Sequence, residues 1–261
     1  MKKYFSIGKI NFLNNIQYSG EFFFKAIFIV LILFIFTNIW KAAYAGQAVV
    51  AGFTITMMIW YLLMTESIVT SSPSLVKDVN KEIQSGEIAY QLNKPYGYIS
   101  YHLAKVMSYR LIGFITTFVI GSFLVFFLVG GLDNFKPILI PFLVITILLA
   151  LILDFFMIMC LALLAFWLED TTSFKWIYDK IVFTLGGMLI PLEIFPKWLA
   201  SISYVMPFSF VAYHPAKLFV NFDLMSFFNV VGMQISYAII FGVLALMIYK
   251  MGIRRVNING G

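Results

Sequence analysis

Two carboxylates within apolar stretches are the residues of this sequence with the clearest chemical potential. Asp154 is the only charged residue between Pro137 and Leu168, and a carboxylate at the centre of a membrane-spanning helix costs about 2.5–3.5 kcal/mol to insert. We predict that Asp154 lies on the inner surface of a helix bundle, where it lines a substrate path or fills a packing role. Glu66 lies near the end of another apolar stretch, where a carboxylate costs little. We favour a structural helix-end role for it, and we also name it as a candidate for the substrate path.

The other residues capable of catalysis or metal binding are too scattered to form a site. His102, His214 and Cys160 lie far apart in the sequence, so we expect this chain to bind neither a metal ion nor another cofactor. No paired carboxylates and no Ser/His pair share one predicted membrane depth, which argues against a membrane-embedded enzyme. The phosphate-binding pattern Gly-x-x-x-x-Gly-Lys-Ser/Thr is absent, so any ATP would be hydrolysed by another chain.

The composition places these residues in a membrane protein. Of the 261 residues, 62% are hydrophobic and only 11% are charged, whereas soluble domains carry about 25% charged residues. Such a chain lacks the polar surface that folding in water requires. We therefore predict an all-α integral membrane protein with one domain, residues 1–261. Basic residues separate the apolar stretches and form no single patch, so the net charge of +6 does not indicate nucleic-acid binding.

Six membrane-spanning helices are predicted from stretches that are poor in charge. Five of them cover residues 22–40, 42–65, 111–132, 137–168 and 224–249. The remaining span falls at 174–192 or, as the alternative, at 198–216. Lysines and arginines flank both ends of the chain, and the positive-inside rule then places both termini in the cytoplasm, which requires an even number of crossings. This topology puts 14 of the 18 basic residues, Arg110 among them, on the cytoplasmic side of a plasma-membrane protein.

Residues 191–222 would then face outward as a re-entrant hairpin of broken helices before the last span. Prolines interrupt this segment, and non-helical backbone at that depth is tolerated only where it is buried in protein or lines water. The candidate residues of this hairpin are Pro191, Glu193, Pro196 and Trp198.

Small residues recur every four positions on the third predicted span, at Gly113, Thr117 and Gly121. This spacing lets two helices approach closely. We expect packing within the chain here, in preference to a seam between two copies.

The longest polar insertion, residues 73–100, follows the second span and has helical character. Ser72 and Pro73 form a helix start, with a hydroxyl at the N-cap and proline at the first helical position. Leu75, Val79 and Ile83 recur at helical spacing. The alternative is a solvated helix that lies on the membrane surface. Residues 1–20 have a similar amphipathic pattern and predict an interfacial helix whose lysines face anionic lipid headgroups.

Two motifs in this framework are similar to those of type-two ABC exporter permeases. The run Ser85-Gly-Glu-Ile-Ala-Tyr-Gln-Leu-Asn-Lys-Pro95 resembles the Gly-x-x-x-x-x-Leu-x-x-Pro segment between spans two and three of that family. The run from Gly187 to Leu199, followed by Pro207, resembles the Gly…Pro-x-x-x-Phe-Pro-x-Trp element before the last span. The resemblance covers essentially the whole chain.

The resemblance implies six helices per subunit, a dimer, and a separate ABC ATPase that holds ATP and Mg²⁺. The helix after span two would be a coupling helix, seated in a groove of that ATPase. Its apolar stripe would anchor in the groove, its charged residues would make rim contacts, and Gly86 would let the chain turn. The candidate coupling residues are Leu75, Val79, Lys81, Glu82, Ile83, Gly86, Glu87, Leu92 and Pro95.

The function implied is that of a permease subunit in an ATP-driven exporter. Its substrate would be hydrophobic or amphiphilic, since the drug, peptide, lipid and glycan branches of the family share these features. The second permease would be an identical copy or a paralogue, and the direction of transport is taken from the family. An ion-coupled secondary transporter is the alternative, although such folds usually show internal repeats and midplane charges that this sequence lacks.

Overall fold

The computed structural model describes residues 2–17, 20–132 and 135–259. Within these ranges the regular structure is helical, apart from an isolated β-bridge between Val50 and Phe53. The elements in chain order are α1 Lys2–Gln17, α2 Gly20–Tyr44, α3 Ile55–Thr70, α4 Leu75–Gln84, α5 Glu87–Leu92, α6 Tyr98–Val129, η1 Pro137–Leu139, α7 Ile140–Ala162, η2 Leu163–Phe166, α8 Thr172–Thr184, η3 Leu192–Ile194, α9 Lys197–Val205, α10 Pro207–Val211, α11 Tyr213–Val220 and α12 Leu224–Asn259.

Among the described residues, four segments are long and apolar enough to cross a membrane. They are Gly20–Tyr44, Tyr98–Val129, Pro137–Phe166 and Leu224–Arg255. The second and fifth predicted spans correspond to shorter helices, α3 and α8. Helix α3 has 16 residues and α8 has 13, so at 1.5 Å per residue they are roughly 24 and 20 Å long. The chain is thus a multi-pass membrane protein, and the count of six crossings remains a prediction.

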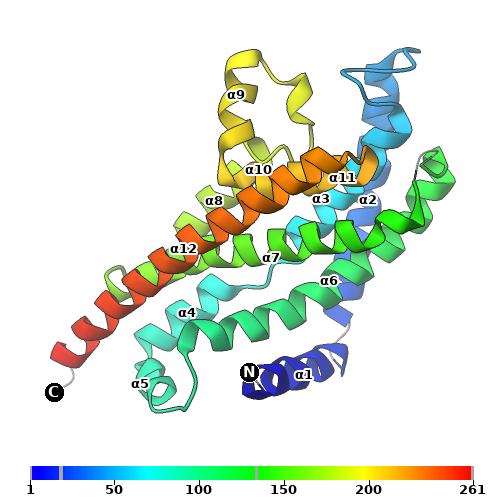
Figure 1. The fold of residues 1–261 in the computed structure, drawn as a ribbon. Helices are drawn as coiled ribbons and strands as arrows, with labels where there is room; N and C mark the ends of the chain where they lie inside the picture. The colour runs from blue at the N-terminus through cyan, green and yellow to red at the C-terminus, as the bar shows by residue number, and fades with distance from the viewer. Residues whose placement is uncertain (1, 18–19, 133–134, 260–261) are drawn as a thin grey trace.

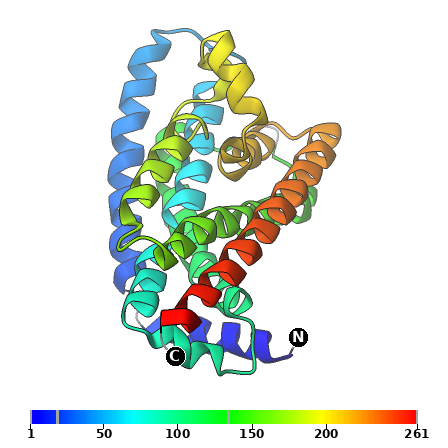
Figure 2. The ribbon, with the colours of Figure 1, turned by 90° about the vertical axis from the view of Figure 1, so that its left-hand side faces the viewer.

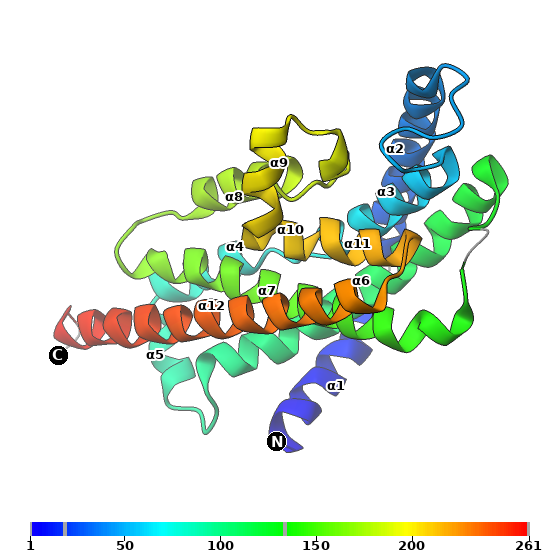
Figure 3. The same cartoon turned by 45° about the horizontal axis from the view of Figure 1, so that its top comes forward.

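The bundle is built around α7. In the most apolar part of the segment Pro137–Phe166, which contains α7, 67% of the residues are buried, compared with 11–24% in the other three candidate spans. The long helix α12 runs alongside α7 (Figures 1 and 3), while α2 and α6 pack against α3 on the other side. The outer faces of α2, α6 and α12 therefore leave large apolar side chains exposed, as contact with lipid requires.

The two ends of the molecule are formed by different elements. Figures 1 and 2 show α1, α4, α5 and the last turns of α12 at one end, which we call the basal end. The α2–α3 connection and α9 lie at the opposite, distal end. Because the described parts of both chain ends are basal, an even number of crossings fits the structure.

The predicted boundaries of two spans are wrong. The helix of the first span continues to Tyr44, and a connection at 45–54 follows before Thr54 caps α3, its hydroxyl accepting a hydrogen bond from the Met57 amide (3.2 Å). That connection contains no charged residue, so a search for charges could not detect it. The helix of the third span begins at Tyr98, well before residue 111, so Arg110 lies inside a helix.

Close packing within the chain explains the small residues of α6. A Cβ atom added at Gly121 would lie 2.3 Å from Leu63 Cδ1, and one at Gly113 would lie 3.4 Å from the Phe22 ring and from the Ser71 backbone. Helices α2 and α3 therefore occupy the face that these glycines leave open. The prediction of intramolecular packing is confirmed.

Candidate functional site

The apolar stripe of α4 is covered by this chain itself. Leu75 and Val79 are buried at 3% and 0% exposure, and α4 packs on α7 and η2. Ile83 is partly buried against the same core. The prediction that this stripe inserts into a groove of a partner is therefore corrected: helical spacing identifies an apolar face, and here the basal end of α7 covers it.

Polar contacts fix the second face of α4 to α6. Asp78 Oδ2 lies 2.9 Å from Lys105 Nζ, and Glu82 Oε2 accepts a hydrogen bond from Tyr98 Oη (2.6 Å). The same oxygen lies 3.1 Å from Nε2 of His102, whose side chain is fully buried. Glu82 thus points toward α6. Burial alone would raise the pKa of the Glu82 carboxyl, but His102, Tyr98 and Lys105 together hold it below the usual value.

A third set of contacts joins α4 to the start of α8. Asn80 Nδ2 donates to Asp170 Oδ1 (2.8 Å), and the Thr171 hydroxyl donates to Asn80 Oδ1 (2.6 Å). Asp170 Oδ1 also accepts from the Thr172 amide (2.8 Å) at the first turn of α8. Because Asn80 is 6% exposed and both atoms of its amide are engaged, α4 and the start of α8 are held together. Sequence reasoning missed these residues, since their partners lie 90 positions away.

The remaining face of this unit is open. Lys81, Gly86 and Glu87 are exposed, and Tyr90 of α5 is 67% exposed. Gly86 has φ 75°, a left-handed conformation that glycine adopts without strain, and it turns the chain from α4 into α5. Among the other candidate coupling residues, Pro95 is exposed, while the Leu92 side chain lies outside the described part of the chain. The exposed face offers charged and aromatic groups at the basal end.

A buried ion pair crosses the bundle above this unit. Arg110 Nη2 lies 2.5 Å from Asp154 Oδ2, and Arg110 Nη1 donates to the Leu151 carbonyl (3.0 Å). The Tyr178 hydroxyl donates to the other Asp154 oxygen, so the network joins α6, α7 and α8. Asp154 faces the bundle interior as predicted. Since both of its oxygens are engaged, the contacts describe the packing role, and a role in the substrate path remains a prediction.

Glu66 occupies a different setting from the one expected. It is 3% exposed inside α3, one turn before the helix ends at Thr70. Its carboxylate has no hydrogen bond or ion pair among the contacts of the described residues. Glu66 therefore lies near a helix end, as the sequence predicts, but its side chain is buried within the chain.

The distal segment 191–222 forms the broken helices that the sequence predicts, namely η3, α9, α10 and α11. Glu193 Oε1 lies 2.7 Å from Lys217 Nζ and accepts a hydrogen bond from Tyr213 Oη (2.7 Å). Lys217 Nζ also lies 4.0 Å from the centre of the Phe53 ring, so α11 contacts the α2–α3 connection. Of the other hairpin candidates, Pro191 is buried, Pro196 is exposed and Trp198 is 68% exposed.

The site thus consists of a basal unit, α4–α5, with contacts to α6, α7 and α8 and one open face. The sequence pattern of the ABC-2 family transporter proteins matches residues 26–260, nearly the whole chain. No curated protein matches the chain significantly. The match includes both motifs on which the resemblance to ABC permeases rests. The chain therefore belongs to the ABC-2 family of transporter proteins and is a permease subunit of an ABC transporter.

Proposed function

We propose that this permease exports a hydrophobic or amphiphilic substrate from the cytoplasm, driven by ATP hydrolysis on a separate ABC ATPase. Family membership supports an ABC ATPase as partner, and the sequence has no phosphate-binding loop of its own. The ATPase would hold ATP and Mg²⁺. A second permease, identical or paralogous, would complete the translocation unit in the plasma membrane, with both termini in the cytoplasm.

The observation that carries the proposal is the mechanical attachment of α4. A subunit that binds the open face can move α4, and α4 is joined to α6 through Asp78–Lys105, to α7 by buried packing, and to α8 through Asn80. Three membrane helices would therefore move with one short element. A helix on a flexible loop would dissipate the same displacement, so this attachment favours a coupling role.

A cavity between α2, the end of α3 and α8 supports an amphiphilic substrate. Its volume is about 640 Å³, which lies within the range of small-molecule sites. Phe24, Phe28 and Val69 supply apolar lining. The ion pairs Glu21–Lys25, at 2.9 Å, and Lys175–Asp179 lie on the same lining. Apolar walls beside charged groups suit a molecule with an apolar body and a polar end.

A transport assay separates this proposal from secondary transport. The chain is reconstituted in vesicles with its ATPase, and extrusion of a fluorescent amphiphile is followed with ATP, without ATP, and with a proton gradient alone. We expect extrusion that requires both ATP and the ATPase. Uptake or extrusion driven by the proton gradient in ATPase-free vesicles would contradict the proposal.

A further inference from the structure

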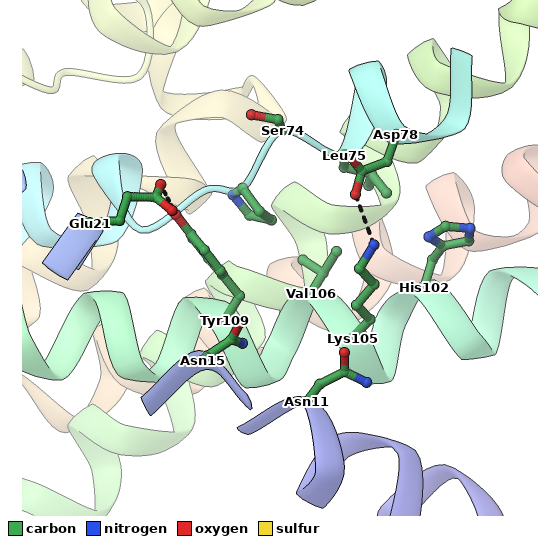
Figure 4. Close-up of a pocket in the computed structure, with 11 residues that line it drawn as sticks. Asn11, Asn15, Glu21, Ser74, Leu75, Asp78, His102, Lys105, Val106 and Tyr109 are labelled. Atoms are coloured by element: carbon green, nitrogen blue, oxygen red, sulfur yellow. Dashed lines mark hydrogen bonds and ion pairs between the residues drawn. The ribbon is translucent and has the colours of Figure 1, made fainter. Parts of the chain in front are cut away.

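A polar cavity of about 210 Å³ lies at the basal end between α1, the start of α2, α4 and α6 (Figure 4). It lies apart from the amphiphile cavity of the proposed function and shares only Glu21 with that cavity's lining. One water molecule needs only about 10–15 Å³, so this cavity has room for a group of several atoms.

Carboxylate oxygens lie at two places on its lining. Glu21 Oε1 accepts from Tyr109 Oη (2.5 Å), and Asp78 Oδ2 pairs with Lys105 (2.9 Å). The second oxygen of each carboxylate has no partner among the described contacts. An ionised carboxylate can accept about four hydrogen bonds, so both retain capacity for an additional donor such as an ammonium group.

Hydrogen-bond donors line the same cavity. The Lys105 ammonium has three N–H groups, and the described contacts engage it with Asp78. Asn15 of α1 lines the cavity, and its amide has no hydrogen bond among the described contacts. Lysine and asparagine side chains are suitable donors to phosphate oxygens. Cationic and anionic positions therefore share one small cavity.

His102 supplies an independent sign that a polar group belongs here. Its side chain is fully buried and lines the cavity, next to the Asp78–Lys105 pair in Figure 4. Nε2 contacts Glu82, but Nδ1 is buried without a hydrogen-bond partner in the described structure. A buried polar atom of this kind is costly unless something bonds to it. The ring lies at the cavity wall, and a small shift of the ring toward the cavity would bring Nδ1 within reach of a ligand or water there.

The surroundings indicate where such a ligand comes from. Helix α1 presents exposed apolar side chains, with Phe5 at 78% and Leu13 at 54% exposure, together with the exposed cations Lys3 and Lys9. This pattern is typical of a helix that lies on an anionic membrane surface. The cavity beneath α1 is therefore close to lipid headgroups.

We propose that this cavity binds a phosphate ester with a primary ammonium group, supplied by the membrane as the headgroup of phosphatidylethanolamine. The ammonium would donate to the free oxygen of one of the two carboxylates, Glu21 or Asp78, and the phosphate would accept from Lys105 and Asn15. A choline headgroup has no N–H to donate, and a glycerol headgroup carries no cation. The site thus selects among lipids by hydrogen bonding and charge.

Competition among lipids tests the selection. The purified full chain is equilibrated with equimolar short-chain phosphatidylethanolamine, phosphatidylcholine and phosphatidylglycerol, and bound lipid is counted by native mass spectrometry. We expect one ethanolamine lipid in preference to the other two. Equal retention of all three lipids would overturn the proposal. A second arm adds soluble O-phosphoethanolamine. If it displaces the lipid at equal concentration, the ligand is a free phosphate ester and the assignment to a membrane lipid fails.

Variants at two neighbouring asparagines locate the site. Asn15→Leu fills the cavity and Asn15→Asp sets a carboxylate against the phosphate, whereas Asn14 is exposed, does not line the cavity, and provides the matched controls Asn14→Leu and Asn14→Asp. Loss of a hydrogen bond to a charged group predicts about tenfold weaker retention in both Asn15 variants, with the Asn14 variants unchanged. Unchanged retention in the Asn15 variants, or equal loss in all four, would place the lipid elsewhere. ATP-dependent transport is not the readout, so this test can fail while the proposed function stands.

Discussion

At the scale of single residues, the ion pair between Arg110 and Asp154 is the most deeply buried one among the described residues. Arg110 is fully buried in α6, and the side chain of Asp154 is 6% exposed in α7. Two charges taken out of water are tolerated only when each satisfies the other, and Tyr178 and the Leu151 carbonyl complete the set. Sequence analysis identified the acid but counted the arginine only among the basic residues of the cytoplasmic side.

We predict that Asp154→Asn destabilises the subunit by about 3–5 kcal/mol, because it leaves Arg110 charged and unpaired in the bundle. The double variant Asp154→Leu/Arg110→Met removes both charges and should recover much of that loss. Thermal unfolding in detergent measures both. A single variant as stable as the wild type would contradict the structural role. A double variant that regains stability but not transport would support the substrate-path prediction for Asp154.

Glu82 gives a pH-dependent prediction. Its folded-state pKa is lowered, so it contributes stability above its unfolded value, near 4.5, and loses that contribution as the pH falls through the lower folded value. The melting temperature of Glu82→Gln should therefore lie below that of the wild type at pH 7, and the gap should close below pH 4.5. A gap that stays constant down to pH 3.5 would show that charge on Glu82 does not hold α4 to α6.

At the scale of elements, the fold depends on how closely helices approach. Helix α6 meets α3 at Gly121, where an added Cβ would lie 2.3 Å from Leu63 Cδ1. Helix α12 has a matched position at Gly232, where an added Cβ would meet nothing within 4 Å. These two glycines share a helical setting and differ in what surrounds them.

Gly121→Ala should lower the melting temperature, because Leu63 or helix α6 must move to make room for the added methyl group. Gly232→Ala should leave the melting temperature unchanged or raise it, because alanine favours a helix over glycine by about 1 kcal/mol. Thermal unfolding of both variants in the same detergent is the measurement. Equal behaviour of the two would show that α6 does not pack as closely on α3 as described.

The sequence predicts where the helices lie better than which residues they pack against. Charge counting locates α7 and α12, because lysines and acids flank them, and fails at 45–54, where the connection is uncharged. Helical spacing identifies the apolar face of α4 but does not show that α7 packs against it. Asn80, His102 and Tyr178 carry no local signal, since their roles come from residues brought together only by folding.

At the scale of the whole molecule, the basal and distal ends determine the topology. Termini, α1 and α4–α5 share the basal end, and the proposed function requires that end to face the cytoplasm (Figure 2). Charge bias across the predicted loops favours the same orientation. Helix α9 would then face outward.

Cysteine labelling in a Cys160→Ala background tests this orientation. Lys81 and Lys197 are exposed at the basal and distal ends, so they form a matched pair. In intact cells, a membrane-impermeant maleimide should label Lys197→Cys and should reach Lys81→Cys only after permeabilisation. The opposite pattern would invert the topology.

The central claim is that the open face of α4–α5 contacts the ATPase, and site-specific photo-cross-linking tests it most directly. A photoreactive amino acid replaces Glu87 at the basal end or Trp198 at the distal end, both exposed positions, and membranes that contain the assembled transporter are irradiated. The account predicts a covalent adduct with the ATPase from position 87 and none from position 198. An ATPase adduct from 198, or none from 87 in a complex that still transports, would contradict it.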